Sequence, residues 1–188
     1  MVSEAPQTRI LDAADLLIGE RGVHGVTIAE LARRAGVSRP TIYRAWNDAD
    51  DVVRAALSRR IAGILDRFPA PVGTGRAALV DDVVLFSALF RADAVFGRLL
   101  EEEPEAFTRY TLQRVGSSQR LILQWLADAI RQAQSDGSVR LDDAEEMAVM
   151  LLLIAQSAIL SHGTVSDLID QTAWERELRR AIDGHLRP

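Results

Sequence analysis

The residues best suited to chemistry lie in one short stretch, 36-GVSRPTIYRAW-46. Its polar side chains are hydroxyls and guanidinium groups, which donate hydrogen bonds and carry positive charge. Such groups suit the binding of an anion or of a hydrogen-bonding edge, and the stretch contains no carboxylate for acid–base work. It therefore predicts a binding surface, whose polar side chains are Ser38, Arg39, Thr41, Tyr43 and Arg44.

Positive charge gathers around this stretch, although the whole chain has a formal net charge of −5. Residues 27–46 hold four arginines and a single glutamate, Glu30. Because salt screens charges beyond roughly 8–10 Å, local charge decides whether a phosphate backbone is attracted at contact distance. The composition therefore argues against a chain that is basic throughout and allows one basic contact patch. All 22 basic residues are arginines, which a coding bias explains as well as a preference for bidentate donors does.

Capping signals predict two short helices in this region. The first, 27–36, begins with the T-x-x-E pattern of a capping box, Thr27 with Glu30, and ends in a glycine. We expect Ser38 to be the N-cap of the next helix. Pro40 falls in its first turn, where a missing N–H loses no helical hydrogen bond. The proline therefore marks the start of a helix and does not break one.

Two short helices joined by a turn that contains glycine are the sequence form of a helix-turn-helix. The turn here is 35–37. In this motif the second helix enters the major groove of DNA, and its N-terminal residues meet base edges. Val37, Ile42 and Trp46 are expected to rest on neighbouring helices and leave the polar side wet. Pro40 adds a rigid apolar surface that could touch a thymine methyl group.

The first 65 or so residues resemble the DNA-binding domain of the TetR family, the tetracycline-repressor-like regulators. The stretches that carry the resemblance are 10-ILDAADLLIGERG-22, 27-TIAELARRAGVSRPTIYRAW-46 and 48-DADDVVRAAL-57. They span the family's helix-turn-helix without a gap. The rest of the chain is similar to the family only in size and helical character.

The resemblance implies a role for individual residues. Tyr43 stands where the family has a tyrosine that contacts a phosphate. Thr27 stands where the family has a hydroxyl that caps the helix and often meets the DNA backbone, and Gly36 holds the turn. Contacts with bases or flanking phosphates are implied for Arg39, Pro40, Thr41 and Arg44.

Two positions depart from the family's pattern. Family members commonly have an aromatic residue or histidine where this chain has Ala45, and a lysine where it has Ala49. Both are typically phosphate contacts. Each neutralised phosphate contributes about −0.9 to the slope of log affinity against log salt. We therefore expect fewer ionic contacts and a shallower dependence on salt.

The whole chain is predicted to be all-α. Segment 69–75, with two prolines and two glycines, is the best linker. It separates a three-helix helix-turn-helix domain with its long connecting fourth helix, 1–68, from a helical ligand-binding and dimerisation domain, 75–188. We expect Asp48, Asp142 and Thr172 to cap helices. The predicted helices are 8–22, 27–36, one from Ser38, 48–67, 75–91, 93–102, 104–114, 117–135, 142–162 and 166–186.

The predicted helix 142–162 is apolar around nearly its whole circumference. Such a helix is buried on more than one side. It is either the central helix of a monomeric bundle or packs partly against a second subunit, and we expect a homodimer. Its apolar run 147–155 is far shorter than the roughly 20 residues of a membrane span, so no membrane is expected. The expected interface residues are Leu151, Ile154, Ala158, Trp174 and Leu178.

The second domain also contains candidates for a small-molecule pocket. The family's C-terminal domain houses such a pocket, so the resemblance implies that some aromatic residues line it, with ordinary core packing as the alternative. Adaptable methionines and a glutamine suit a small-molecule effector that is mainly apolar. The candidate residues are Phe86, Phe90, Phe107, Tyr110, Trp125, Met147, Met150 and Gln156.

No pattern indicates catalysis, a cofactor or a metal. The three histidines lie far apart, and the chain has no Gly-x-Ser-x-Gly elbow, phosphate loop or cysteine. The run 101-EEEPE-105 could hold a cation, but a solvated helix junction broken by Pro104 explains it too. We expect no enzyme activity, no metal and no cofactor. The lack of cysteine and of a signal-peptide pattern favours a cytoplasmic protein.

The resemblance to the TetR family, together with the long connecting helix, implies a homodimeric repressor that a small, mainly apolar ligand releases from a palindromic DNA operator. Two reading heads would lie about 34–36 Å apart, or a multiple of this. The ligand would favour a state whose heads are out of register, with the fourth helix as the lever. The alternatives are an activator, a family member without ligand control and, in another class, an all-helical enzyme.

Overall fold

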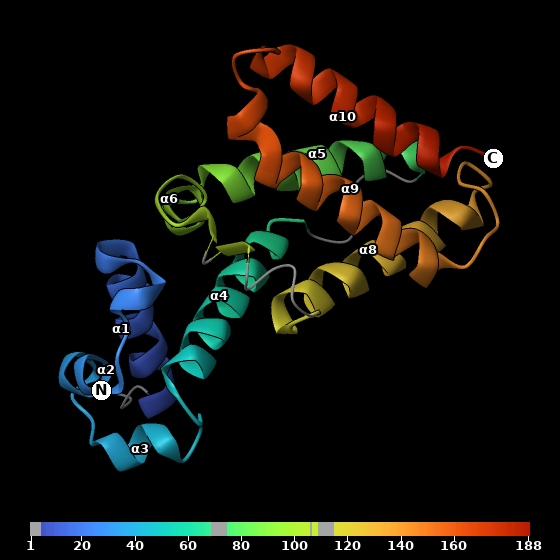
Figure 1. Ribbon diagram of the computed structural model, residues 1–188. Helices are drawn as coiled ribbons and strands as arrows, with labels where there is room; N and C mark the ends of the chain where they lie inside the picture. The colour runs from blue at the N-terminus through green and yellow to red at the C-terminus, as the bar shows by residue number, and fades with distance from the viewer. Residues whose placement is uncertain (1–4, 69–74, 106, 109–114) are drawn as a thin grey trace. The chain divides into compact units, whose positions relative to one another are not determined.

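The computed structural model describes residues 5–68, 75–105, 107–108 and 115–188, and this part of the chain is helical with no β-strand. Figure 1 shows the order of its helices along the chain. Their bounds are α1 Pro6–Arg21, the 3₁₀ helix η1 Val23–Gly25, α2 Ile28–Ala35, α3 Arg39–Tyr43, α4 Ala49–Leu65, α5 Arg76–Ala92, α6 Ala94–Glu102, α8 Ser117–Ser135, α9 Ala144–Val165 and α10 Gln171–Leu186.

The all-α prediction is confirmed, and the observed helices fall close to most of the predicted ranges. The start of the last helix is the main difference, since 166–186 was expected and α10 begins at Gln171. Residues 69–74 of the predicted linker and 109–114 of the predicted helix 104–114 lie outside the described residues.

The N-caps of the last two helices differ from the predicted ones. Asp143 caps α9 and Asp170 caps α10, and each carboxylate accepts the N–H of the third residue along. Asp142 is instead bound by the side chain of Arg140, and Thr172 already lies within the first turn of α10. Both predictions were wrong by one or two residues. Asp142 and Asp143 are equally good caps by type, and Asp170 is a better cap than Thr172.

The chain forms two compact units. Unit 1 is Met1–Arg60 with Asp93–Ser118, and unit 2 is Ile61–Ala92 with Gln119–Pro188. Helix α4 therefore contributes to both units, whereas α6 belongs to unit 1 and not to the second predicted domain. The boundary differs from the predicted one because side chains tie α6 to earlier helices. The carboxylate of Asp93 lies 2.7 Å from Nη1 of Arg60, and Arg98 donates a hydrogen bond to the carbonyl of Gly19.

The core of unit 1 forms where the apolar stripe of α1 meets its neighbours. Helix α1 buries five side chains, and α2 and α3 add one large residue each, Leu31 and Ile42, both fully buried. Burial of such a side chain contributes about 1.5–3 kcal/mol, so these two residues hold the short helices in place. The buried residues of α1 are Ile10, Ala13, Ala14, Leu17 and Ile18.

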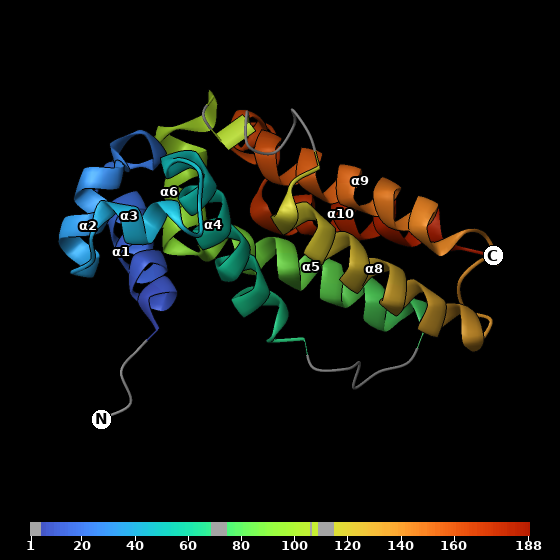
Figure 2. The same cartoon turned by 90° about the horizontal axis from the view of Figure 1, so that it is seen from below.

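Unit 2 is a bundle in which α5 and α10 both pack against α9 (Figures 1 and 2). One side of α9 is buried in this bundle, with Leu151 fully covered. The opposite side carries large apolar residues in the open: Val149, Met150 and Leu153 are 43%, 46% and 49% exposed. Helix α9 is therefore apolar on a face that this protomer does not cover.

Helix α9 is also the one described helix that is long and apolar enough to cross a membrane, with a mean hydropathy of 1.7. The membrane prediction considered only the continuous apolar run 147–155 and not the whole predicted helix 142–162. Length and composition alone are weak evidence, because a core helix of a helical bundle has the same features. The packing of α9 against α5 and α10 accounts for the apolar residues on its buried side.

Candidate nucleic-acid interface

The turn between α2 and α3 sets the direction of the candidate reading helix. Gly36 ends α2 in the left-handed conformation, with φ 62°, and its N–H donates to the carbonyl of Ala32. A residue with a side chain is strained in this region, so the glycine is required by the backbone. Helix α3 then begins with Pro40 in its first turn, as predicted.

Helix α3 has only five residues and is held from beneath by one apolar anchor. Ile42 is 0% exposed, and Val37 and Trp46 are half-buried beside it, so the predicted support of the helix is present. Tyr43 is 55% exposed and points away from this core. A phenol in solvent is free to donate to a phosphate oxygen, as the prediction for Tyr43 requires.

A row of polar groups follows α3 on its solvent side. The hydroxyls of Ser38 and Thr41 lie 2.8 Å apart, and Nη2 of Arg44 donates to Oγ1 of Thr41 over 3.2 Å. Arg39 and Pro40 are exposed beside this row. Ser38 occupies the predicted N-cap position, but its side chain makes no cap hydrogen bond, because Thr41 engages its hydroxyl instead. The structure thus brings the predicted α3 contacts together on one surface.

Thr27 stands at the start of α2, where its Oγ1 accepts the N–H of Glu30 over 3.2 Å. This is one half of the predicted capping box. In place of the other half, the carboxylate of Glu30 binds Arg33 and Arg21, and these bonds hold the pKa of Glu30 below its usual value. Thr27 is exposed, so its hydroxyl can still donate outward.

Arginines near the turn divide into two kinds. Arg33 pairs with Glu30 at 2.7 Å, and Arg34 pairs with Glu20, whose pKa the Arg34 bond lowers. In contrast, Arg39 and Arg44 have no carboxylate within 4 Å in the described part of the chain. Charge on α3 is therefore free for a ligand, whereas charge at the end of α2 is neutralised within the protein. This favours the solvated-helix interpretation of Arg33 and Arg34 over DNA contact.

The two departures from the family's pattern lie at the two ends of the short connection between α3 and α4. Ala45 is exposed just after α3, and Ala49 is the half-buried first residue of α4. Asp48 caps α4, as predicted, by accepting the N–H of Asp51 over 2.7 Å. A hydrogen bond from Arg54 lowers the pKa of Asp51, so this carboxylate is anionic. The start of α4 therefore presents acidic groups and alanines, and its cation Arg54 is already paired with Asp48 and Asp51.

The predicted pocket residues do not converge on one place. Phe86, Phe90 and Trp125 pack together in unit 2, where the rings of Phe86 and Trp125 have centroids 5.7 Å apart. Phe107 packs against Phe96 in unit 1, at 6.2 Å between centroids. Met150 is exposed. Of the others, Met147 is buried close to Gln134, Gln156 accepts a hydrogen bond from Gln119, and Tyr110 lies outside the described residues.

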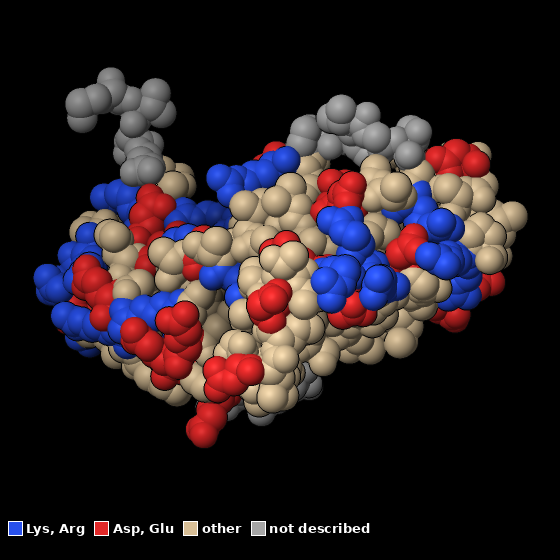
Figure 3. Space-filling model, turned by 90° about the horizontal axis from the view of Figure 1, so that it is seen from above, with Lys and Arg blue, Asp and Glu red and all other residues tan. Residues whose placement is uncertain are grey.

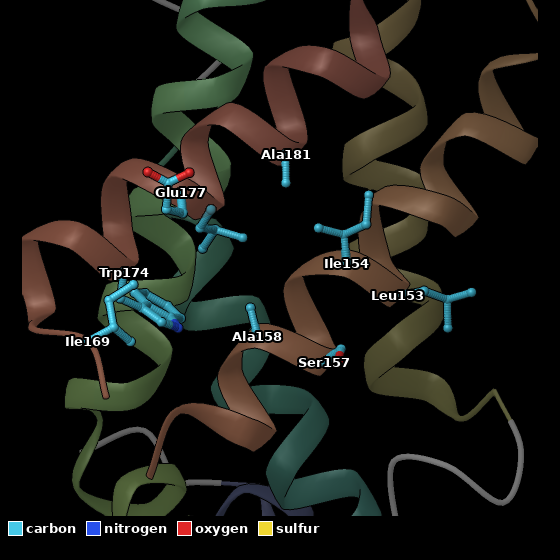
Figure 4. Close-up of a pocket in the computed structure, with 9 residues that line it drawn as sticks. Leu153, Ile154, Ser157, Ala158, Ile169, Trp174, Glu177 and Ala181 are labelled. Carbon is cyan, nitrogen blue, oxygen red and sulfur yellow. The ribbon is translucent and has the colours of Figure 1, made fainter. Parts of the chain in front are cut away.

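Four of the five predicted interface residues line an open groove of about 540 Å³ between α9 and α10: Ile154, Ala158, Trp174 and Leu178. Figure 4 shows Ile154 and Ala158 on α9 facing Trp174 and Ala181 on α10. Leu151 differs, because it is fully buried in the core of its own unit and has no surface for a partner. Leu153 is exposed and also lines the groove. It lies four residues after Val149, on the same face of the helix, and this spacing of apolar residues would have identified it.

Charges elsewhere form local pairs. On the face seen in Figure 3, arginines and carboxylates are interspersed. Ion pairs such as Arg187 with Asp183, 2.6 Å apart, occur throughout the described residues of the second unit. Among the described residues, no group of histidine and carboxylate side chains has the arrangement of a metal site.

The fold and the exposed polar helix together define a helix-turn-helix protein with a second helical unit. Residues 10–56 match the family model of bacterial regulatory proteins, tetR family. The chain is 40% identical over 178 residues to an uncharacterised HTH-type transcriptional regulator of Mycobacterium bovis, and the alignment covers 95% of this chain and 93% of the relative. The chain therefore belongs to the TetR family of transcriptional regulators.

Solved structures share this fold. The R. erythropolis transcriptional repressor QsdR of the TetR family superposes with a TM-score of 0.75 at 18% identity, over 96% of this chain and 94% of that one. FadR from Bacillus subtilis, in complex with stearoyl-CoA, superposes with a TM-score of 0.67 at 16% identity, over 96% and 99%. TetR regulators bind DNA operators and small-molecule effectors, typically as dimers, and are generally not enzymes.

Proposed function

We propose that this regulator is a homodimeric repressor in the cytoplasm, which a small, mainly apolar effector releases from a palindromic operator. The observation that carries the proposal is the surface of α3. A buried Ile42 holds this helix, while hydroxyls and two arginines that have no carboxylate partner in the described part of the chain are exposed. Such a surface suits base edges and phosphates in the major groove.

Individual contacts follow from chemistry. A guanidinium donates two parallel hydrogen bonds to the O6 and N7 acceptors of guanine, so Arg39 and Arg44 suit base readout or a flanking phosphate. Thr41 and Ser38 can donate or accept, and Tyr43 and Thr27 suit phosphate oxygens. Direct base contacts provide discrimination between sequences, whereas phosphate contacts fix the register of the protein on DNA.

The proposed dimer uses the uncovered side of α9 and the groove beside α10. Large apolar residues are exposed there, and Trp174 and Leu178 form the floor of the groove. Burial of this apolar surface against a second copy would stabilise the dimer, because the surface is exposed to water in the single chain. Two copies related by a twofold axis would present two reading helices to an inverted repeat.

Effector control is proposed to act through α4, because this one continuous helix contributes residues to both units. An effector that binds one state of the dimer better than the other shifts the population toward that state. The aromatic cluster of Phe86, Phe90 and Trp125 in unit 2 supports an apolar effector. The Bacillus subtilis FadR structure holds stearoyl-CoA, which is in keeping with a partly apolar ligand class.

The proposal is tested by replacing Thr41 and Arg44 together with alanine. Fluorescence anisotropy would compare binding to duplex DNA from upstream of the protein's own gene with binding to a shuffled duplex. We expect the variant to lose the preference for upstream DNA while circular dichroism remains helical. Arg33→Ala is the matched control, because this arginine is paired with Glu30, and it should keep the preference. Retention of the preference by the double variant would contradict the reading-helix assignment.

A further inference from the structure

The arginines of unit 1 differ in whether the protein neutralises them. Most have a carboxylate oxygen within 4 Å of a guanidinium nitrogen. In the described part of the unit, Arg9, Arg39 and Arg44 do not. The last two belong to the proposed reading helix, whereas Arg9 lies on α1 and is not explained by the motif. The paired arginines are Arg21, Arg33, Arg34, Arg54, Arg59, Arg60 and Arg98.

The side chain of Arg9 lies against the turn that precedes α3. Its Nη1 is 3.9 Å from the point that a Cβ atom would occupy on Gly36. Helix α1 packs against α2 and also contacts α3, and Figure 2 shows the three helices together. The guanidinium beside Gly36 therefore lies next to the turn that leads into the reading helix. Gly36 itself is exposed and has no side chain, which leaves this part of the backbone open to an approaching ligand.

The guanidinium of Arg9 lacks a partner where one is needed. Its Nε is buried and has no hydrogen-bond acceptor among the described residues. Removal of a charged donor from water without an acceptor costs free energy, and buried charges are therefore normally paired. The Nε of Arg60 is also buried without an acceptor, but its Nη1 bonds to Asp93. Arg9 has no carboxylate within 4 Å among the described residues, so it fits a site whose anion is supplied from outside the chain.

We propose that Arg9 binds a backbone phosphate of DNA beside the turn, so that α1 takes part in the interface. The inference rests on the proposed function, because it assumes that α3 lies in the major groove. A phosphate oxygen accepts charge-assisted hydrogen bonds from a guanidinium in the geometry that Arg favours. The contact fixes the duplex against the turn and carries no sequence information. It partly replaces the phosphate contacts that Ala45 and Ala49 do not make.

The test measures how DNA affinity depends on salt. Arg9→Gln removes the charge, Arg9→Lys retains it, and Arg21→Gln is the control, since Arg21 is an arginine of the same helix already paired with Glu30. Anisotropy titrations over a series of NaCl concentrations would use the upstream duplex and a shuffled duplex. Loss of one phosphate contact makes the slope of log affinity against log salt shallower by about 0.9. We expect this change for Arg9→Gln on both duplexes, and wild-type slopes for Arg9→Lys and Arg21→Gln.

An unchanged slope for Arg9→Gln would overturn the inference, and so would the same change in Arg21→Gln. If Arg9→Gln loses helical circular dichroism, Arg9→Met keeps the packing of the side-chain stem and takes its place in the same titration. The outcome is separable from failure of the proposed function. A wild-type protein without any preference for the upstream duplex would refute the operator, yet the slope on the shuffled duplex would still test Arg9.

Discussion

Asp93 is the residue whose replacement tests most sharply how α6 is tied to unit 1. Its Oδ1 accepts the N–H groups of Val95 and Phe96 at 3.0 and 3.1 Å and so caps α6. Its Oδ2 lies 2.7 Å from Nη1 of Arg60 on α4. The two side chains are 16% and 27% exposed, so the pair is largely shielded from water. Asp93→Ala removes both functions at once.

The expected loss is the sum of a cap and a shielded ion pair. A lost N-cap costs about 0.5–2 kcal/mol. Hydrogen bonds to charged groups contribute about 1.5–3 kcal/mol, and the weaker contact of Arg60 with Asp15, at 3.8 Å, remains in the variant. We therefore expect Asp93→Ala to lower the free energy of unfolding by about 2–4 kcal/mol. Asp93→Ser keeps a capping oxygen and should recover about 1 kcal/mol of this loss.

The assay is urea unfolding followed by circular dichroism. It is applied to Asp93→Ala, Asp93→Ser, Arg60→Gln and the double variant that combines Asp93→Ser with Arg60→Gln. Residues in direct contact show interaction energies of about 0.5–3 kcal/mol in such a cycle, and we expect about 1–2 kcal/mol here. Additive single effects would refute the ionic link between α4 and α6. Equal losses for Asp93→Ser and Asp93→Ala would refute the cap.

Three further predictions address the anchor, the dimer and the dependence on pH. Ile42→Ala removes a fully buried side chain and should lower the unfolding free energy by about 2–5 kcal/mol in urea titrations, and a loss below about 1 kcal/mol would show that Ile42 is no anchor. Leu153→Glu should yield monomers in sedimentation velocity. Leu141→Glu is the control, because Leu141 is 83% exposed outside the groove, and this variant should stay dimeric. A Leu153→Glu protein that remains dimeric would exclude this interface. Burial and Arg140 lower the pKa of His185 from 6.5, so its stabilising effect is present above that pH and is lost as pH falls through the folded value. Between about pH 7 and 5, the free energy of unfolding in urea should therefore fall less for His185→Gln than for the wild type. Equal decreases in the two proteins would show that His185 does not cause this pH dependence.

The helix-turn-helix was predictable because its signals are local. Gly36 adopts a left-handed backbone conformation, and Pro40 lies in the first turn of α3, so both positions are fixed by the geometry of the backbone. Ile42 was predictable as the anchor because a short polar helix has few apolar residues to bury. The bond between Ser38 and Thr41 was not predictable, because two hydroxyls three residues apart can cap the backbone or pair with each other.

Features that depend on tertiary contacts were less accessible. The capping role of Asp93 could have been predicted from its place before α6. Its bond to Arg60, which brings α6 into unit 1, could not, because the two residues are 33 positions apart in the sequence. The side of α9 that is exposed could not be read from a helix that is apolar all round, and so Leu151 was placed at the interface and not in the core. Phe107 and Phe86 share residue type but pack in different units.

The central claim, that α3 reads a palindromic operator, is tested most directly by selecting binding sites from a pool of random duplexes. The account predicts that the wild-type protein enriches two inverted half-sites whose centres lie about 34–36 Å apart, or a multiple of this. The Thr41→Ala, Arg44→Ala double variant should enrich neither half-site. Failure of the wild type to enrich any sequence, or enrichment of the same half-sites by both proteins, would contradict the account.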